Sequence, residues 1–153
     1  MNEQGGGKAN RRGKMLEGSV ESILRESYEK CTPGRFFALR ELEQPIFARE
    51  CRIGKDLYGK QRRVDFILYH SQKWPDSLVI QCKWQASSGS VEEKYPFEVL
   101  SIELSEFKAI IILDGDGYST GSKKWLQDQA GKKKLLHVMS LADFQRFCTR
   151  GDL

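Results

Sequence analysis

The spacing of apolar residues divides the chain into alternating helices and strands. The first apolar set recurs at the three- and four-residue spacing of one helix face: Leu16, Val20, Ile23, Leu24 and Tyr28. The sequence Thr32-Pro33-Gly34 then ends this helix. Three strands are predicted next from alternating apolar positions, at residues 46–53, 62–70 and 78–85, with a turn at Trp74-Pro75-Asp76 before the third.

The second half of the chain alternates between helix and strand. A helix is predicted from Gly89-Ser90 to about Leu104, and the continuous apolar run at 107–113 is typical of a central strand. A short helix at 123–129, a strand at 135–139 and a helix that Ser140 and Asp143 would cap complete the order. This order predicts one α/β domain over residues 14–153, with a mixed central sheet flanked by helices.

The first thirteen residues differ from the rest in composition. They are polar and rich in glycine, which predicts a flexible arm rather than part of the core. Basic residues of the first fourteen positions contribute most of the net charge of +4: Lys8, Arg11, Arg12 and Lys14. Such an arm suits contact with nucleic-acid phosphates, but it would equally serve as a solubilising tail.

Composition excludes several classes of protein. Apolar residues make up 39% and charged residues 30% of the chain, and no apolar run is long enough for a membrane span or a signal peptide. We therefore expect a cytoplasmic, nucleoid-associated protein without a membrane partner. The four cysteines form no CxxC pair and only two histidines are present, which argues against structural zinc and a disulfide framework. No motif indicates an organic cofactor.

Polar residues on the predicted strands suggest a catalytic cleft. Strand alternation places Gln81, Lys83 and Gln85 on one face of the 78–85 strand. If this strand pairs with the 62–70 strand as a hairpin, Asp65 can face the same cleft. A carboxylate beside a lysine, with an amide oxygen nearby, suits magnesium-assisted hydrolysis of a phosphodiester.

These residues resemble the D…(D/E)XK signature of the PD-(D/E)XK nuclease superfamily. Asp65 stands for the first acidic residue and Gln81-Cys82-Lys83 for the second part, while the RGKMLE segment at 12–17 resembles the opening of the first core helix. The element order matches the restriction-endonuclease-like core, α-β-β-β-α-β, followed here by helix, strand and helix. Two positions depart from the commoner pattern. Val64 replaces a proline, and Gln81 replaces an acid as in the QXK form of Mrr-like members.

The resemblance implies a Mg²⁺-dependent DNA endonuclease of the restriction or repair type, in which Mn²⁺ can substitute. It implies that the metal is bound by Glu17, Asp65, Gln81 and the backbone carbonyl of Cys82, and that Lys83 is catalytic. Glu21, one helical turn beyond Glu17, is the alternative helix ligand. Gln85 would contact phosphate or substrate, or else face solvent.

Further basic residues are candidate DNA contacts: Arg11, Arg12, Lys94, Lys123 and Lys124. For the last two, the alternative is that this segment only caps a helix. Cutting both strands with one site per chain would favour a homodimer. Two other functions stay open: a Holliday-junction resolvase, and a catalytically degenerate DNA-binding module, which would need no metal.

Overall fold

The computed structural model describes the backbone of residues 3–85 and 92–153 and the side chains of residues 11–85 and 92–153. Within these residues, six strands form one sheet in the order β1-β2-β3-β4-β5-β6. The strands are β1 (Glu29–Lys30), β2 (Ile46–Lys55), β3 (Gln61–His70), β4 (Trp74–Trp84), β5 (Lys108–Asp114) and β6 (Leu135–Met139). The helices are α1 (Glu3–Leu24), α2 (Phe36–Leu39), α3 (Lys94–Leu104), α4 (Thr120–Gln129) and α5 (Leu141–Thr149).

The sheet is mixed, as its connections require. β2, β3 and β4 form an antiparallel meander, whereas β4, β5 and β6 are parallel and are joined by helical crossovers. The short β1 adds a parallel edge next to β2. A mixed central sheet with flanking helices confirms the predicted fold class.

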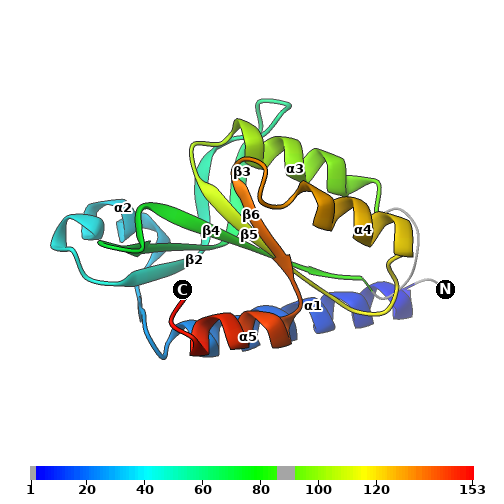
Figure 1. Cartoon of the computed structure of the whole chain (residues 1–153), viewed down its shortest axis with the longest axis horizontal. Coiled ribbons are helices and arrows are strands. Elements are labelled where there is room, and N and C mark those ends of the chain that lie inside the picture. Colours follow the sequence, from blue (N-terminus) through cyan, green and yellow to red (C-terminus); the bar gives the residue numbers. More distant parts are fainter. Residues whose placement is uncertain (1–2, 86–91) are drawn as a thin grey trace.

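Helices cover both faces of the sheet (Figure 1): α1 and α5 lie on one face, and α3 and α4 lie on the other. Each face has its own apolar core. On the α1 side, Val20 and Leu24 pack against strand residues such as Ile110. On the α3 side, Ile102 and Leu126 pack in the second core. The continuous apolar run of β5 contributes to both, which explains why its sequence does not alternate.

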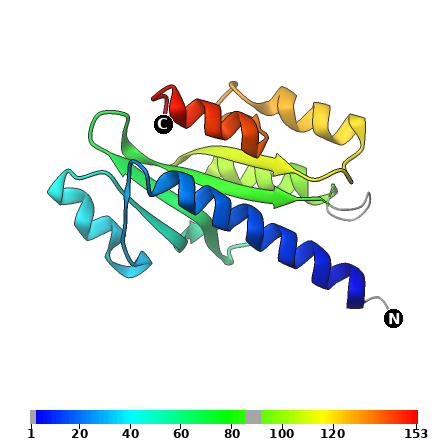
Figure 2. The same ribbon diagram turned by 90° about the horizontal axis from the view of Figure 1, so that it is seen from below.

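Helix α1 begins at Glu3, eleven residues before the predicted domain boundary at residue 14. The predicted apolar stripe is buried, but its last residue, Tyr28, lies beyond the helix, which ends at Leu24 and not at the predicted Thr32-Pro33-Gly34. In the other direction the helix continues towards the N-terminus, and this end projects beyond the sheet (Figure 2). Glycine disfavours helix through its intrinsic propensity. Once a helix is nucleated by its buried turns, however, each added residue gains a hydrogen bond, so extension is easier than initiation.

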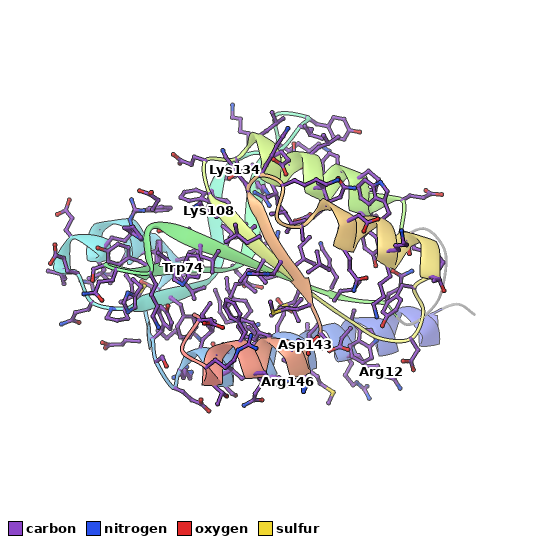
Figure 3. All side chains as sticks on the ribbon, in the orientation of Figure 1. Arg12, Trp74, Lys108, Lys134, Asp143 and Arg146 are labelled. Carbon is purple, nitrogen blue, oxygen red and sulfur yellow. The ribbon has the colours of Figure 1, made fainter. Side chains whose placement is uncertain are left out.

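Most other elements lie where the sequence predicted them. β6 spans the predicted residues, and the Ser140 hydroxyl accepts a 3.1 Å hydrogen bond from the Asp143 amide at the start of α5. On the same helix, Asp143 pairs with Arg146 at 2.8 Å (Figure 3). For α4 the capping residue is Ser119, whose side chain accepts from the Ser122 amide.

The predicted turn before β4 was also wrong, and the predicted start of α3 falls on residues that the structure does not describe. Trp74 begins β4 instead of forming a turn, and it pairs with His70. The turn lies at residues 71–73, where the His70 ring accepts hydrogen bonds from the Gln72 and Lys73 amides, each 3.1 Å long. α3 begins at Lys94, and the predicted start at Gly89-Ser90 falls within residues 86–91, which are not described.

A compact segment between α1 and β2 was not predicted. It consists of β1, α2 and the short 3-10 helices η1 (Pro33–Arg35) and η2 (Arg40–Leu42). Phe36 anchors it, because its side chain is fully buried in the core on the α3 side of the sheet. No helix among the described residues has both the length and the apolar character that crossing a membrane requires.

Candidate active site

The site lies where strands β3 and β4 separate. Going away from the turn that joins the two strands, their last backbone pair is Phe66 with Ile80. One residue further, side chains bridge the two strands: the Asp65 amide donates to Gln81 Oε1 at 2.9 Å, and the Cys82 amide donates to Asp65 Oδ2 at 2.8 Å. The two parts of the predicted motif are thus joined by direct hydrogen bonds at this fork.

Helix α1 brings a second carboxyl group to the fork. The Glu17 side chain lies next to that of Asp65, close enough for each carboxyl group to affect the pKa of the other. Burial and the neighbouring Asp65 raise the pKa of Glu17. Burial also raises the pKa of Asp65, although the Cys82 amide and the charge of Lys83 act in the opposite direction. Two neighbouring carboxyl groups that are partly buried repel each other when both are charged, so they favour binding a proton or a cation between them.

On the other side of the fork, Glu98 of α3 connects the remaining residues. Its carboxylate accepts a 3.1 Å hydrogen bond from Gln81 Nε2 and lies 3.6 Å from Lys83 Nζ. It also pairs with Arg62 at 3.5 Å, whose side chain is only 7% exposed. Glu98 was not predicted as a site residue. The sequence feature that could have identified Glu98 is an acidic residue on the face of α3 that carries the buried residues Tyr95 and Ile102.

The predicted single polar face is divided between the two layers of the fold. Asp65 reaches towards Glu17 on α1, whereas Gln81 and Lys83 reach towards α3. The cause is an interruption of strand alternation. On a regular strand, side chains three residues apart point to opposite faces of the sheet. Val64 and Ile67 are three residues apart, yet both pack in the core on the α3 side. In the paired strand, the residue opposite Asp65 is Glu50, which has a left-handed backbone with φ of 52°.

The two alternative site residues have other partners. Glu21 is held by Lys30 at 2.6 Å and by Arg49 at 3.8 Å, and the hydrogen bond from Lys30 lowers its pKa. Gln85 is buried, and its side chain bonds the hydroxyl of Tyr95 and the carboxylate of Glu92. The structure therefore places Glu17, not Glu21, beside Asp65.

The five predicted DNA contacts lie on three helices. Arg11 and Arg12 are exposed on α1, where the Arg12 guanidinium lies 5.7 Å from the centre of the Trp84 ring. Lys94 is exposed at the start of α3. On α4, Lys123 lies over Tyr118, and Lys124 pairs with an aspartate of the same helix at 3.5 Å. Lys124 is exposed and Lys123 is half-buried.

The residues at the fork fit a hard divalent cation that keeps several waters. Within the described part of the chain, no three His, Cys, Asp or Glu side chains are placed to hold a metal. Two carboxylates, Glu17 and Asp65, would supply the charge, and neutral oxygens would have to complete the protein's share. In a strand the N–H and C=O of one residue point the same way. The Cys82 carbonyl therefore faces the same gap as the Cys82 amide that bonds Asp65. Magnesium accepts such oxygen ligands and usually retains water.

Comparison with known proteins identifies the family. A family model described as a PD-(D/E)XK nuclease superfamily domain matches residues 8–151, nearly the whole chain. No curated protein and no solved structure gives a significant match. The matched range includes Glu17, the strand fork and Glu98. The chain belongs to the PD-(D/E)XK nuclease superfamily.

Proposed function

We propose that the protein is a metal-dependent endonuclease that hydrolyses phosphodiester bonds in DNA. One observation carries the proposal: the neighbouring carboxyl groups of Glu17 and Asp65 lie at the strand fork, close enough to Lys83 for the lysine charge to act to lower the pKa of Asp65. Two carboxylates can hold a divalent cation, and that cation together with the nearby lysine can neutralise the negative charge on the phosphate oxygens while water attacks phosphorus.

A divalent cation at this fork would supply Lewis-acid chemistry, neutralising phosphate charge and acidifying a water. Glu17 and Asp65 are the charged residues that would hold it, with the Gln81 amide oxygen and the Cys82 carbonyl as neutral ligands. Gln81 Oε1 already accepts from the Asp65 amide. A carbonyl oxygen has a second lone pair, so this bond leaves it able to bind a cation.

Lys83 is the residue that would orient the attacking water and contact the scissile phosphate. Its ammonium lies 3.6 Å from Glu98 Oε2, and this ion pair restricts where the side chain can point. Glu98 therefore acts as a positioning residue, since it also fixes the Gln81 amide. Holding a catalytic group in one orientation lowers the entropic cost of reaching the transition state.

The proposal is tested by incubating the protein with supercoiled, linear, single-stranded and four-way-junction DNA, each with Mg²⁺, Mn²⁺ or EDTA. We expect cleavage in either metal and none in EDTA. Exclusive cutting of the junction would identify a resolvase. The products of the supercoiled substrate would distinguish nicking, which gives open circles, from double-strand breaks, which give linear DNA. Binding of DNA without cleavage in any metal would contradict the proposal and favour the non-catalytic DNA-binding module.

A further inference from the structure

A strongly basic pocket of about 850 Å³ adjoins the candidate active site. It lies between the end of α1, β1, and the strands β2 and β3. Five basic side chains line it, Arg25, Lys30, Arg49, Arg52 and Arg63, with Glu50 the acidic residue among the lining. The whole chain carries a net charge of only +4, so this concentration of positive charge is local. A pocket with this lining is suited to an anionic ligand.

Two of these arginines oppose each other directly. Arg52 of β2 and Arg63 of β3 are cross-strand partners, and both side chains are exposed. Like charges in this relation are destabilising. Among the ion pairs formed by described residues, none includes either guanidinium. The pair therefore has an unfavourable arrangement that no ion pair among the described residues offsets, and a bound anion would relieve it.

Strand geometry places both arginines on the α1 face of the sheet. Arg52 lies between Cys51 and Ile53, which pack in the core on the α3 side, and Arg63 precedes Val64 of the same core. Since side chains alternate along a strand, Arg52 and Arg63 point to the opposite face. That is the face on which Asp65 meets Glu17 of α1.

Arg49 links the pocket to the carboxyl pair. Its guanidinium lies 3.8 Å from Glu17 Oε1 and also 3.8 Å from Glu21 Oε1. Glu50, on the pocket wall, is the residue opposite Asp65. Two residues of strand, roughly 7 Å, separate this point from Arg52. That length corresponds to about two nucleotide steps of one DNA strand.

We propose that this basic pocket binds the sugar-phosphate backbone of the DNA strand that enters the candidate active site. The inference rests on the proposed function, and it assigns substrate contact to residues on β2 and β3, in addition to the candidate contacts on the helices. Arg52 and Arg63 each contact a phosphate, while Glu21 holds Arg25, Lys30 and Arg49 along the path to the carboxyl pair. Guanidinium groups suit this role because their donors match phosphate oxygens in pairs.

The test is the affinity of the full-length double variant R52Q/R63Q for a short labelled DNA duplex, measured by fluorescence anisotropy in EDTA. The matched control is K132Q/K133Q. It removes the same charge from exposed lysines in the loop before β6, a strand at the opposite edge of the sheet from β1. We expect R52Q/R63Q to bind at least about tenfold more weakly at 0.1 M salt, with a log-log salt slope flatter by about 2. The control should differ by much less.

The same variant should be as thermally stable as the wild type or more so, since the like-charge pair is removed. Affinity and salt slope unchanged from the wild type, or an equal loss in the control, would overturn the proposal. The proposal would also be overturned if R52Q/R63Q, relative to the wild type, lost as much affinity for polyglutamate as for DNA. That result would assign the pocket to acidic partners in general. Because binding is measured in EDTA, a protein that binds DNA through these arginines but never cleaves it refutes the proposed function alone.

Discussion

Gln81 shows how a neutral residue is accommodated at a position where the superfamily commonly has an acid. Its amide works in both directions: the oxygen accepts from the Asp65 amide at 2.9 Å, and the nitrogen donates to Glu98 at 3.1 Å. A carboxylate could keep the first bond but not the second, because it has no donor. Glutamine at position 81 and glutamate at position 98 are therefore a matched pair.

This pairing changes what we expect of an apparently restorative substitution. Gln81→Glu supplies the commoner ligand, yet it places a second carboxylate against Glu98, so we predict a loss of about 1–3 kcal/mol in the free energy of unfolding. The double variant Q81E/E98Q exchanges the two groups and should recover most of that loss. Urea unfolding of the wild type, Q81E, E98Q and Q81E/E98Q measures the coupling. Equal stability of Q81E and the wild type would show that the Gln81–Glu98 bond contributes little.

Glu17 and Asp65 give a prediction with a definite sign in pH. Burial raises the pKa of both groups above their values in the unfolded chain, so the folded state binds more protons. The stability they contribute is complete below the unfolded pKa of about 4 and is lost as pH rises through the folded values. In EDTA at pH 8, Glu17→Gln should therefore have a Tm equal to or above that of the wild type.

Added Mg²⁺ separates this effect from a simple change in packing. It should raise the Tm of the wild type at pH 8, because a ligand that binds only the folded state stabilises it, and it should raise that of Glu17→Gln less. Differential scanning fluorimetry at about pH 4.5 and pH 8 measures both. A Tm for Glu17→Gln well below the wild type in EDTA at pH 8 would mean that the charged pair stabilises the metal-free fold.

At the scale of elements, the sequence predicted those whose pattern is local. β6 and the Ser140 cap of α5 follow from alternation and from one capping side chain. The start of β4 at Trp74 and the compact segment around Phe36 do not, since both depend on contacts with distant parts of the chain. Pro75 indicated a turn by its usual preference, but the adjoining hairpin extends past it.

The candidate site was predictable as a set of residues but not as an arrangement. Glu17, Asp65, Gln81 and Lys83 could be selected from order and spacing, and the structure brings them to one fork. Strict alternation could not predict that Asp65 and Gln81 would serve opposite layers. That outcome depends on the strand irregularity at Glu50 and Asp65, for which no single residue type is a reliable signal.

The connection after β5 also gives a stability prediction. Gly115 has φ of +102°, and a Cβ there would lie 2.2 Å from the carbonyl oxygen of Gln85. Gly115→Ala should therefore reduce the free energy of unfolding by more than about 2 kcal/mol, because backbone must move. Gly121→Ala is the matched control: its Cβ would meet nothing within 4 Å, and it lies in α4, where alanine is favoured. Thermal unfolding compares them, and equal stabilities would contradict the close approach.

At the scale of the whole molecule, the N-terminal end of α1 remains a separate candidate for DNA contact. It projects beyond the sheet (Figure 2), while Glu17 lies further along the same helix. Deleting residues 1–13 removes Lys8, Arg11 and Arg12, and we expect the log-log salt slope of DNA binding to flatten by roughly 2 to 3 units. The variant K8Q/R11Q/R12Q, which keeps the helix length, should reproduce the effect. An unchanged slope in both would show that the segment only aids solubility.

The central claim is that the Glu17–Asp65 fork is a metal-dependent catalytic site for DNA cleavage. Its most direct test is the rate of cleavage of supercoiled plasmid across a range of Mg²⁺ concentrations by the wild type, Asp65→Asn and the surface control Asp128→Asn. Asparagine can still accept from the Cys82 amide, so the fold should persist and circular dichroism should confirm it. We predict metal-dependent cleavage by the wild type and the control, and a loss of at least about 100-fold in Asp65→Asn. Cleavage by folded Asp65→Asn at the wild-type rate would contradict the account.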